Sequence, residues 1–271
     1  MSAVTAWYAL LDGGPDAVSG ALDSLWADLA AREPLDRLGN DWLVGAVRLA
    51  NTGFPTPDVS PYLSPSARYG QQQLRETLER HVDFSRVPGL FDRDCPDLIV
   101  GTVDVEGGVF ESFRNEAITC DVLLASAAVP ELFPAVRMNG HAHWDGLFSQ
   151  NPPIHELFAD DPKPDELWVV QINPQTIDAE PKSLTEIADR RNELAGNISL
   201  NQELRFVETV NDWIDAGHLP TDEYSHTEIR RVQLRRRFSA ASKLDRRPAF
   251  VEELLAGGHE RGRDLLDDAW L

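Results

Sequence analysis

The residues best suited to chemistry lie between Asp121 and Phe158, and Asp145 stands at the centre of that stretch. Asp145 follows an alternating run, His141–Trp144, and precedes Gly146. A strand holds its last side chain in a fixed place, and a following glycine lets neighbouring backbone approach closely. Asp-Gly is also a common turn sequence, but a turn here would leave a strand of only four residues between two hairpins. We therefore interpret Asp145 as a strand-end carboxylate placed for chemistry.

His141, His143 and Asp145 form a second pattern that could carry chemistry, because they alternate along the same run. Side chains at that spacing point to one face of a strand, and imidazole and carboxylate groups are ligands for zinc. A metallohydrolase that uses these three residues is therefore an alternative. However, the next residue is Gly146, and no further histidine cluster completes a site. We favour histidines on a solvent-facing strand, and we predict no metal and no other cofactor.

A β-hairpin should position Asp145. Asn139-Gly140 is a strong signal for a two-residue turn, because both residues tolerate a positive φ. Residues Ala135–Met138 should therefore pair with His141–Trp144. This arrangement predicts that the Asp145 carboxylate lies at the end of the second strand of the hairpin.

Two helices should flank this hairpin. The apolar run Val122–Ala128 predicts a short helix that ends before Pro130, since proline cannot donate a backbone hydrogen bond. After the hairpin, Asn151 is a candidate N-cap, and the two following prolines suit a first helical turn. We expect the Asp145 carboxylate to face a pocket between these segments, lined by residues such as Pro130, Leu147 and Phe148.

Three motifs carry a resemblance to a known family: ASAAVPELFP at 125–134, HWDG at 143–146 and SQNPPI at 149–154. In this order and spacing they resemble the patatin-like phospholipases. That family hydrolyses lipid acyl esters with a dyad made of a serine in G-x-S-x-G and an aspartate in D-G-G or D-G-A. The resemblance implies that Asp145 is the general base, followed by Gly146 and Leu147 as the rest of its motif. Leu147 departs from the glycine or alanine that the family usually has there.

The nucleophile of such a dyad is missing from the sequence, because no G-x-S-x-G occurs. Ser19 and Ser126 have small neighbours, but no buried strand is predicted directly before either, as a nucleophile elbow requires. The resemblance implies that the chain begins just after the nucleophile, so that only the aspartate of the Ser-Asp dyad is present. The alternative is a catalytically inactive patatin-like protein with a binding or regulatory role.

The charge of the chain limits its partners. A formal net charge of −20 argues against nucleic acid and against electrostatic attraction to anionic membranes, since both are negatively charged. A lipid or small acyl-ester substrate would have to bind through apolar contact, which is compatible with peripheral contact with a membrane. Cys95 and Cys120 have no C-x-x-C spacing, which favours a reducing environment. We therefore predict a cytoplasmic protein.

Strands alternate with helical segments, which favours the α/β class. Asp97–Val105 and Glu166–Ile172 are mostly apolar and predict buried strands, while Val109–Phe113 should pair with the first through a glycine turn. A further strand is predicted within His226–Phe238. The resemblance implies a three-layer α/β/α fold that is incomplete at its N-terminal end. It also implies a catalytic domain over residues 1–158, with residues 159–271 as part of the same globule.

Helical periodicity accounts for most of the remaining sequence. A first helix should end at Asp12-Gly13-Gly14, where Gly-Gly followed by Pro15 explains this D-G-G more simply than catalysis does. In a longer helical segment, Gly196 and Asn197 predict a kink or break. The predicted helical segments are 2–11, 16–32, 42–49, 74–82, 183–216 and 250–271.

Overall fold

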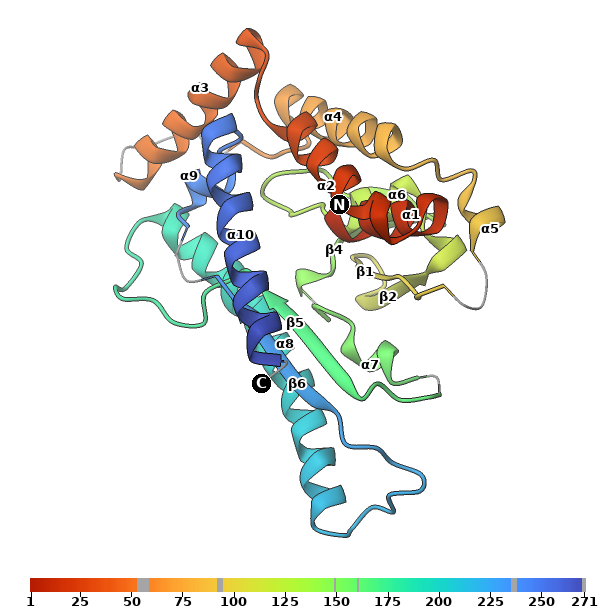
Figure 1. Ribbon diagram of the computed structural model, residues 1–271. Helices are drawn as coiled ribbons and strands as arrows, with labels where there is room; N and C mark the ends of the chain where they lie inside the picture. Colours follow the sequence, from red (N-terminus) through yellow and green to blue (C-terminus); the bar gives the residue numbers. More distant parts are fainter. Residues whose placement is uncertain (53–58, 92–94, 149, 160, 235–237, 270–271) are drawn as a thin grey trace. The chain divides into compact units, whose positions relative to one another are not determined.

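The computed structural model describes the chain except for residues 53–58, 92–94, 149, 160, 235–237 and 270–271 (Figure 1). Contacts between residues divide the chain into two compact units. Unit 1 comprises Met1–Ala30 and Pro57–Pro153, and unit 2 comprises Ala31–Thr56 and Ile154–Leu271. Each unit combines helices with a β-sheet, which confirms the predicted α/β class.

Unit 1 contains a four-stranded antiparallel sheet with the strand order β2-β1-β4-β3. Its strands are β1 (Ile99–Asp104), β2 (Val109–Arg114), β3 (Val136–Met138) and β4 (His141–Asp145). The predicted pairing of the first two strands through a glycine turn is confirmed, and Gly108 in that turn has a φ of 68°. Neighbouring β1 and β4 are far apart in sequence, so the middle of the sheet depends on long-range pairing.

Helices surround this sheet in unit 1, and local sequence explains where they begin and end. Gly14, with a φ of 77°, ends the first helix, and Pro15 starts the second, as predicted. Ser64 and Thr119 cap later helices, because their hydroxyl oxygens accept hydrogen bonds from backbone N–H groups in the first turn. The α-helices of unit 1 are α1 (Ser2–Gly13), α2 (Pro15–Leu29), α4 (Pro65–His81), α5 (Val87–Leu90) and α6 (Cys120–Ser126).

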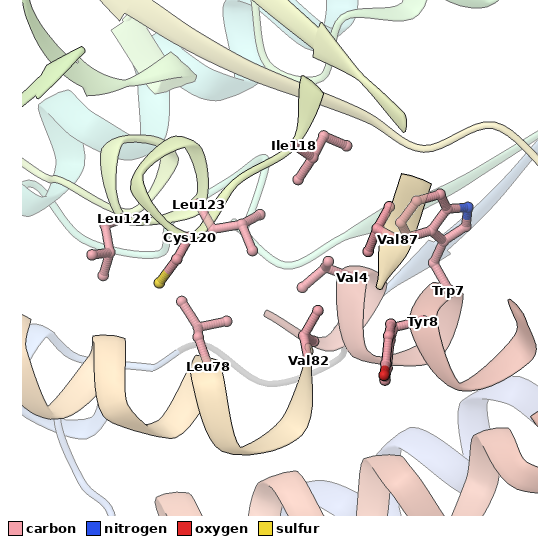
Figure 2. Close-up of a cluster of buried hydrophobic side chains, with 10 residues drawn as sticks. All are labelled: Val4, Trp7, Tyr8, Leu78, Val82, Val87, Ile118, Cys120, Leu123 and Leu124. Carbon is pink, nitrogen blue, oxygen red and sulfur yellow. The ribbon is translucent and has the colours of Figure 1, made fainter. Parts of the chain in front are cut away.

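Figure 2 shows the core of unit 1, into which α1, α4, α5 and α6 direct apolar side chains. Leu78 is completely buried, and Val82 and Val87 are nearly so. Three side chains of the sheet, Val100, Phe113 and Val136, pack against the same cluster. These three residues share one face of the sheet with Asp145, since they occupy paired positions in register with it. The core therefore covers the face that carries the Asp145 side chain.

Unit 2 is built around one parallel pair of strands, β5 (Glu166–Gln171) and β6 (Glu228–Gln233). Parallel strands need a long crossover, and the 32-residue helix α8 (Leu184–Asp215) lies in that connection. Helices α3 (Pro34–Asn51), α7 (Ile154–Leu157), α9 (Ala240–Lys243) and α10 (Pro248–Ala269) complete the unit. No helix in the described part of the chain has both the length and the apolar character needed to cross a lipid bilayer.

Two predictions for unit 2 are wrong. β5 is not buried on both faces: Leu167 and Val169 pack against α8, whereas Val170 is 75% exposed. Trp168 is also exposed, so alternate residues of β5 face outward. The helix α8 also runs without a break through Gly196 and Asn197. The side-chain amide of Asn197 is buried and forms hydrogen bonds with groups outside α8. These bonds explain why a polar residue occupies a buried position in the helix.

The helix predicted after Asn151 exists but begins later. α7 starts at Ile154, so Asn151 lies too far ahead to be its N-cap. The cause is the pair of prolines, because a residue before proline is disfavoured in the helical region and Pro152 precedes Pro153. The remaining predicted helices are present, although α3 begins eight residues before the predicted start at Trp42 and α4 begins nine residues before the predicted start at Leu74.

Candidate active site

The β3–β4 hairpin places Asp145 as the sequence predicts. The two strands pair antiparallel, and the turn residues Asn139 and Gly140 have φ values of 52° and 90°. These positive values explain why Asn-Gly occupies the turn. β4 ends at Asp145, so the carboxylate belongs to the last residue of a paired strand.

Strand pairing and two hydrogen bonds hold the backbone and side chain of Asp145. Asp145 lies opposite Thr102 of β1 in the sheet. Its N–H donates to the carbonyl oxygen of Ala128, just beyond α6, over 3.2 Å. The N–H of Leu147 donates to the Asp145 Oδ1 over 2.9 Å. The carboxylate is thus fixed by a strand, by the segment after a helix and by its own following turn.

Gly146 lies in close contact with the backbone of β1. A Cβ atom added at Gly146 would stand 3.0 Å from the carbonyl oxygen of Gly101 and 3.1 Å from its carbonyl carbon. Such a contact is too short for a side chain without movement of the strand. Glycine after Asp145 is therefore required by the approach of two backbone segments, as expected from the sequence.

Leu147 does not disturb this arrangement despite its size. Its side chain is half-buried, and its backbone N–H donates to the Asp145 carboxylate. A backbone donor is available from any residue except proline. The leucine in place of glycine or alanine therefore still provides the hydrogen bond that orients the carboxylate.

Burial changes the acidity of Asp145. It raises the pKa of this carboxyl group from 3.8 to about 6, opposed by the hydrogen bond from the Leu147 N–H. Burial favours the neutral acid because an ion loses its hydration in the protein. A carboxylate with this pKa is a better proton acceptor near neutral pH than an ordinary aspartate.

The structure does not bring His141, His143 and Asp145 together as metal ligands. His143 is completely buried, not solvent-facing as predicted, because its strand face packs against the core. Its Nδ1 lies 3.2 Å from the Thr102 hydroxyl, and its Nε2 lies 3.9 Å from a Glu111 carboxylate oxygen. The group of possible ligands found among the described residues is a different one.

That group consists of Asp104, Glu106 and His141, whose ligand atoms lie within 4.8 Å of one another. His141 Nδ1 is 2.9 Å from the Asp104 carboxylate. Asp104 also accepts hydrogen bonds from two N–H groups of the β1–β2 turn, and Glu106 forms an ion pair with Arg137. The acidic pair at positions 104 and 106 is visible in the sequence, but its contact with His141 follows from strand pairing. Turn formation and ion pairing account for this group.

The two serines with small neighbours are not placed as nucleophiles. Ser19 is exposed in the middle of α2, which follows another helix. Ser126 is the last residue of α6, which follows a 3-10 turn at Asn115–Ala117. Neither serine stands on a sharp turn from a strand into a helix.

A pocket of about 320 Å³ lies elsewhere in unit 1, between α4, α6 and β3. Arg68, Arg75 and Arg137 contribute to its walls, and Asp145 does not. The pocket predicted beside Asp145 remains a prediction. Of its expected lining, Pro130 and Leu147 are half-buried, and the side chain of Phe148 lies outside the described residues.

Comparison with protein families connects this geometry to a known group. The family model described as patatin-like phospholipase matches residues 3–158. The matched range includes all of α6, the β3–β4 hairpin and the Asp145-Gly146 pair. Curated proteins gave no match to the chain.

Proposed function

Because the chain belongs to the patatin-like phospholipase family, we propose that Asp145 is the proton acceptor of a lipid acyl hydrolase. The family match supports a lipid substrate. The observation that supports the role of Asp145 is its carboxylate, which stands at a strand end and has a pKa raised to about 6. The proposed reaction needs no metal and no other cofactor.

The proposed chemistry uses a serine and Asp145 without a histidine between them. The serine oxygen attacks the acyl carbonyl carbon, and its proton passes to the Asp145 carboxylate. The bond to the leaving alcohol then breaks, and the alcohol oxygen takes that proton. Water releases the acyl group in the same manner, and Asp145 again accepts and returns a proton.

The proposal requires a nucleophilic serine besides Asp145. The sequence contains no G-x-S-x-G, and neither Ser19 nor Ser126 stands on a strand-to-helix turn. The same absence favours the second candidate function, a patatin-like binding or regulatory protein without catalysis. The two functions differ in what the coding DNA before Met1 contains and in what the longer product does.

Two measurements test the proposal. The first is translation of the genomic DNA upstream of Met1, where we expect an in-frame glycine-rich segment and a G-x-S-x-G motif. The second is hydrolysis of a short-chain p-nitrophenyl ester by the 271-residue chain and by the longer product. We expect turnover only from the longer product, because the shorter chain has the proton acceptor without the nucleophile.

Substitutions in the longer product then test Asp145 itself. Asp145→Asn should abolish most of the turnover while the fold remains intact. Asp121→Asn is a matched control, since it removes the same charge from a half-exposed ion pair with Arg75. If the 271-residue chain hydrolyses the ester and loses this activity on Asp145→Asn, the nucleophile lies within the chain and the proposal is wrong. A stop codon directly before Met1 together with no turnover would favour the binding protein.

A further inference from the structure

Helix α3 is attached to unit 2 through one of its faces. Val44 and Asn40 on that face are almost completely buried. The Asn40 amide nitrogen donates to the carbonyl oxygen of Leu244 over 2.8 Å, and its amide oxygen accepts from the Arg246 N–H over 3.1 Å. Asp36 forms an ion pair with the Arg246 guanidinium. These contacts fix both the position and the rotation of α3, beside α9 in Figure 1.

The opposite face of α3 exposes large apolar side chains. Leu35, Leu38, Trp42 and Leu49 are 84%, 68%, 74% and 47% exposed. They follow one another at intervals of three, four and seven residues, so they form one stripe along the helix. A single exposed leucine needs no explanation, but a contiguous apolar patch marks an interaction surface. We call these four residues the α3 stripe.

The charges of α3 lie beside the stripe and not within it. Asp36, Arg37, Asp41 and Arg48 occupy the rest of the helix, and their formal charges cancel. Glycines at 39 and 45 fill the spaces between the apolar residues. The helix α3 itself thus carries no formal net charge, in a chain whose formal net charge is −20.

We propose that the α3 stripe binds the surface of a lipid bilayer composed of zwitterionic lipids. This inference rests on the proposed function, since a lipid acyl hydrolase must reach ester bonds in a lipid phase. The helix has 18 residues and would lie flat, with its leucines among the acyl chains and Trp42 at the headgroup level. A helix without formal net charge suits neutral headgroups, whereas anionic lipids would repel the rest of the chain.

A second copy of the chain is a poorer occupant of the stripe. A stable protein interface uses about 20–30 residues on each side. The stripe offers four large side chains on one helix. A lipid bilayer does not require a complementary surface on the protein. Any apolar area that is buried among the acyl chains contributes to the binding free energy, whatever its shape.

Vesicle binding by the full chain tests this inference without any turnover. The chain is mixed with vesicles of phosphatidylcholine, and the bound fraction is measured after sedimentation over a range of lipid concentrations. Trp42→Ser and Leu38→Ser should each lower the partition coefficient by about tenfold, since each removes one buried apolar side chain. Trp213→Ser is the matched control and should bind as the parent does, because Trp213 is 46% exposed on α8, outside the stripe.

Each of the following three outcomes would contradict the inference. Equal binding by the parent and Trp42→Ser shows that the stripe does not contact lipid. Tighter binding to phosphatidylserine vesicles than to phosphatidylcholine shows that charge, not the stripe, decides the contact. A dimer in size-exclusion chromatography that Trp42→Ser dissociates, without vesicle binding by the parent, shows that the stripe joins two copies. Hydrolysis of a soluble ester is independent of all these results, so failure of the stripe and failure of the Asp145 proposal are distinguishable.

Discussion

Gly146 stands against Gly101 so closely that a Cβ atom at position 146 would lie 3.0 Å from the carbonyl oxygen of Gly101. The contact joins the residue after Asp145 to the middle of β1. We expect Gly146→Ala to lower the free energy of unfolding by about 1–3 kcal/mol, because one of the two backbone segments must move. Urea denaturation of the full chain measures this change.

Gly20→Ala provides the control for that substitution. Gly20 lies inside α2, and an added Cβ would have no atom within 4 Å. Alanine there should raise the free energy of unfolding by up to about 1 kcal/mol, since it favours the helix over the unfolded chain. If both substitutions change stability alike, the contact between Gly146 and Gly101 is not what makes position 146 sensitive.

Asp145→Asn should stabilise the protein at neutral pH. Burial raises the pKa of Asp145 from 3.8 to about 6, so the folded state holds the proton more tightly than the unfolded chain does. The favourable contribution of the neutral acid is complete below pH 4 and is lost as the pH rises through about 6. Ionised Asp145 therefore costs up to about 3 kcal/mol, which asparagine avoids while it still accepts the Leu147 hydrogen bond.

The measurement for Asp145→Asn is urea denaturation at pH 4 and at pH 8. The substituted and parent chains should differ by up to about 3 kcal/mol at the higher pH and by little at the lower one. A difference of the same size at both values would show that the effect is not ionisation of Asp145. Asp121→Asn controls for loss of a charge, since Asp121 is half-exposed beside Arg75.

The activity of the longer product should rise with pH, whereas the stability that Asp145 contributes falls as the pH rises. Only ionised Asp145 accepts a proton, and its pKa is raised to about 6. We expect kcat/KM for a soluble ester to fall about tenfold for each pH unit below that value. A rate that is constant between pH 7 and pH 5 would show that Asp145 is not the proton acceptor.

Asn197 should contribute to stability although it lies inside a helix. The Gln171 side-chain amide donates to its oxygen over 3.0 Å, and its own amide nitrogen donates to the Pro174 carbonyl oxygen over 2.9 Å. Asn197→Ala removes these two hydrogen bonds, at a cost of about 1–3 kcal/mol in free energy of unfolding, while the Pro174 carbonyl keeps its bond from Arg190 and the Gln171 amide keeps its bond to Gln175. Asn201→Ala, on the same helix, removes only an exposed bond to Gln175 and should cost less than about 0.5 kcal/mol. Equal losses would mean that burial of Asn197 is unimportant.

The local features around Asp145 could be predicted because their causes are local. Asn139-Gly140 specifies its turn through backbone conformations that other residues avoid. That turn sets the register of β3 and β4, which in turn puts Asp145 at the strand end. The short helix before it follows from the apolar run Val122–Ala128, and it ends at Ser126, before Pro130. In each case a pattern of a few neighbouring residues was sufficient to predict the local structure.

Features that depend on distant partners could not be predicted. His143 was expected on a solvent-facing strand, but its neighbours Thr102 and Glu111 come from strands far away in the sequence. Val170 was expected to be buried because it lies in the mostly apolar run Glu166–Ile172, so the sequence there does not show which residues of β5 face outward. Asn197 was likewise expected to break its helix. The sequence alone does not show that its side chain bonds to Gln171, which belongs to a different element.

The buried carboxylate of Asp145 also bears on the choice between an enzyme and a binding protein. A negative charge that is largely removed from water at neutral pH weakens the folded state. The proposed hydrolase needs this charge as its proton acceptor, whereas the proposed binding protein would be more stable with a neutral side chain at position 145.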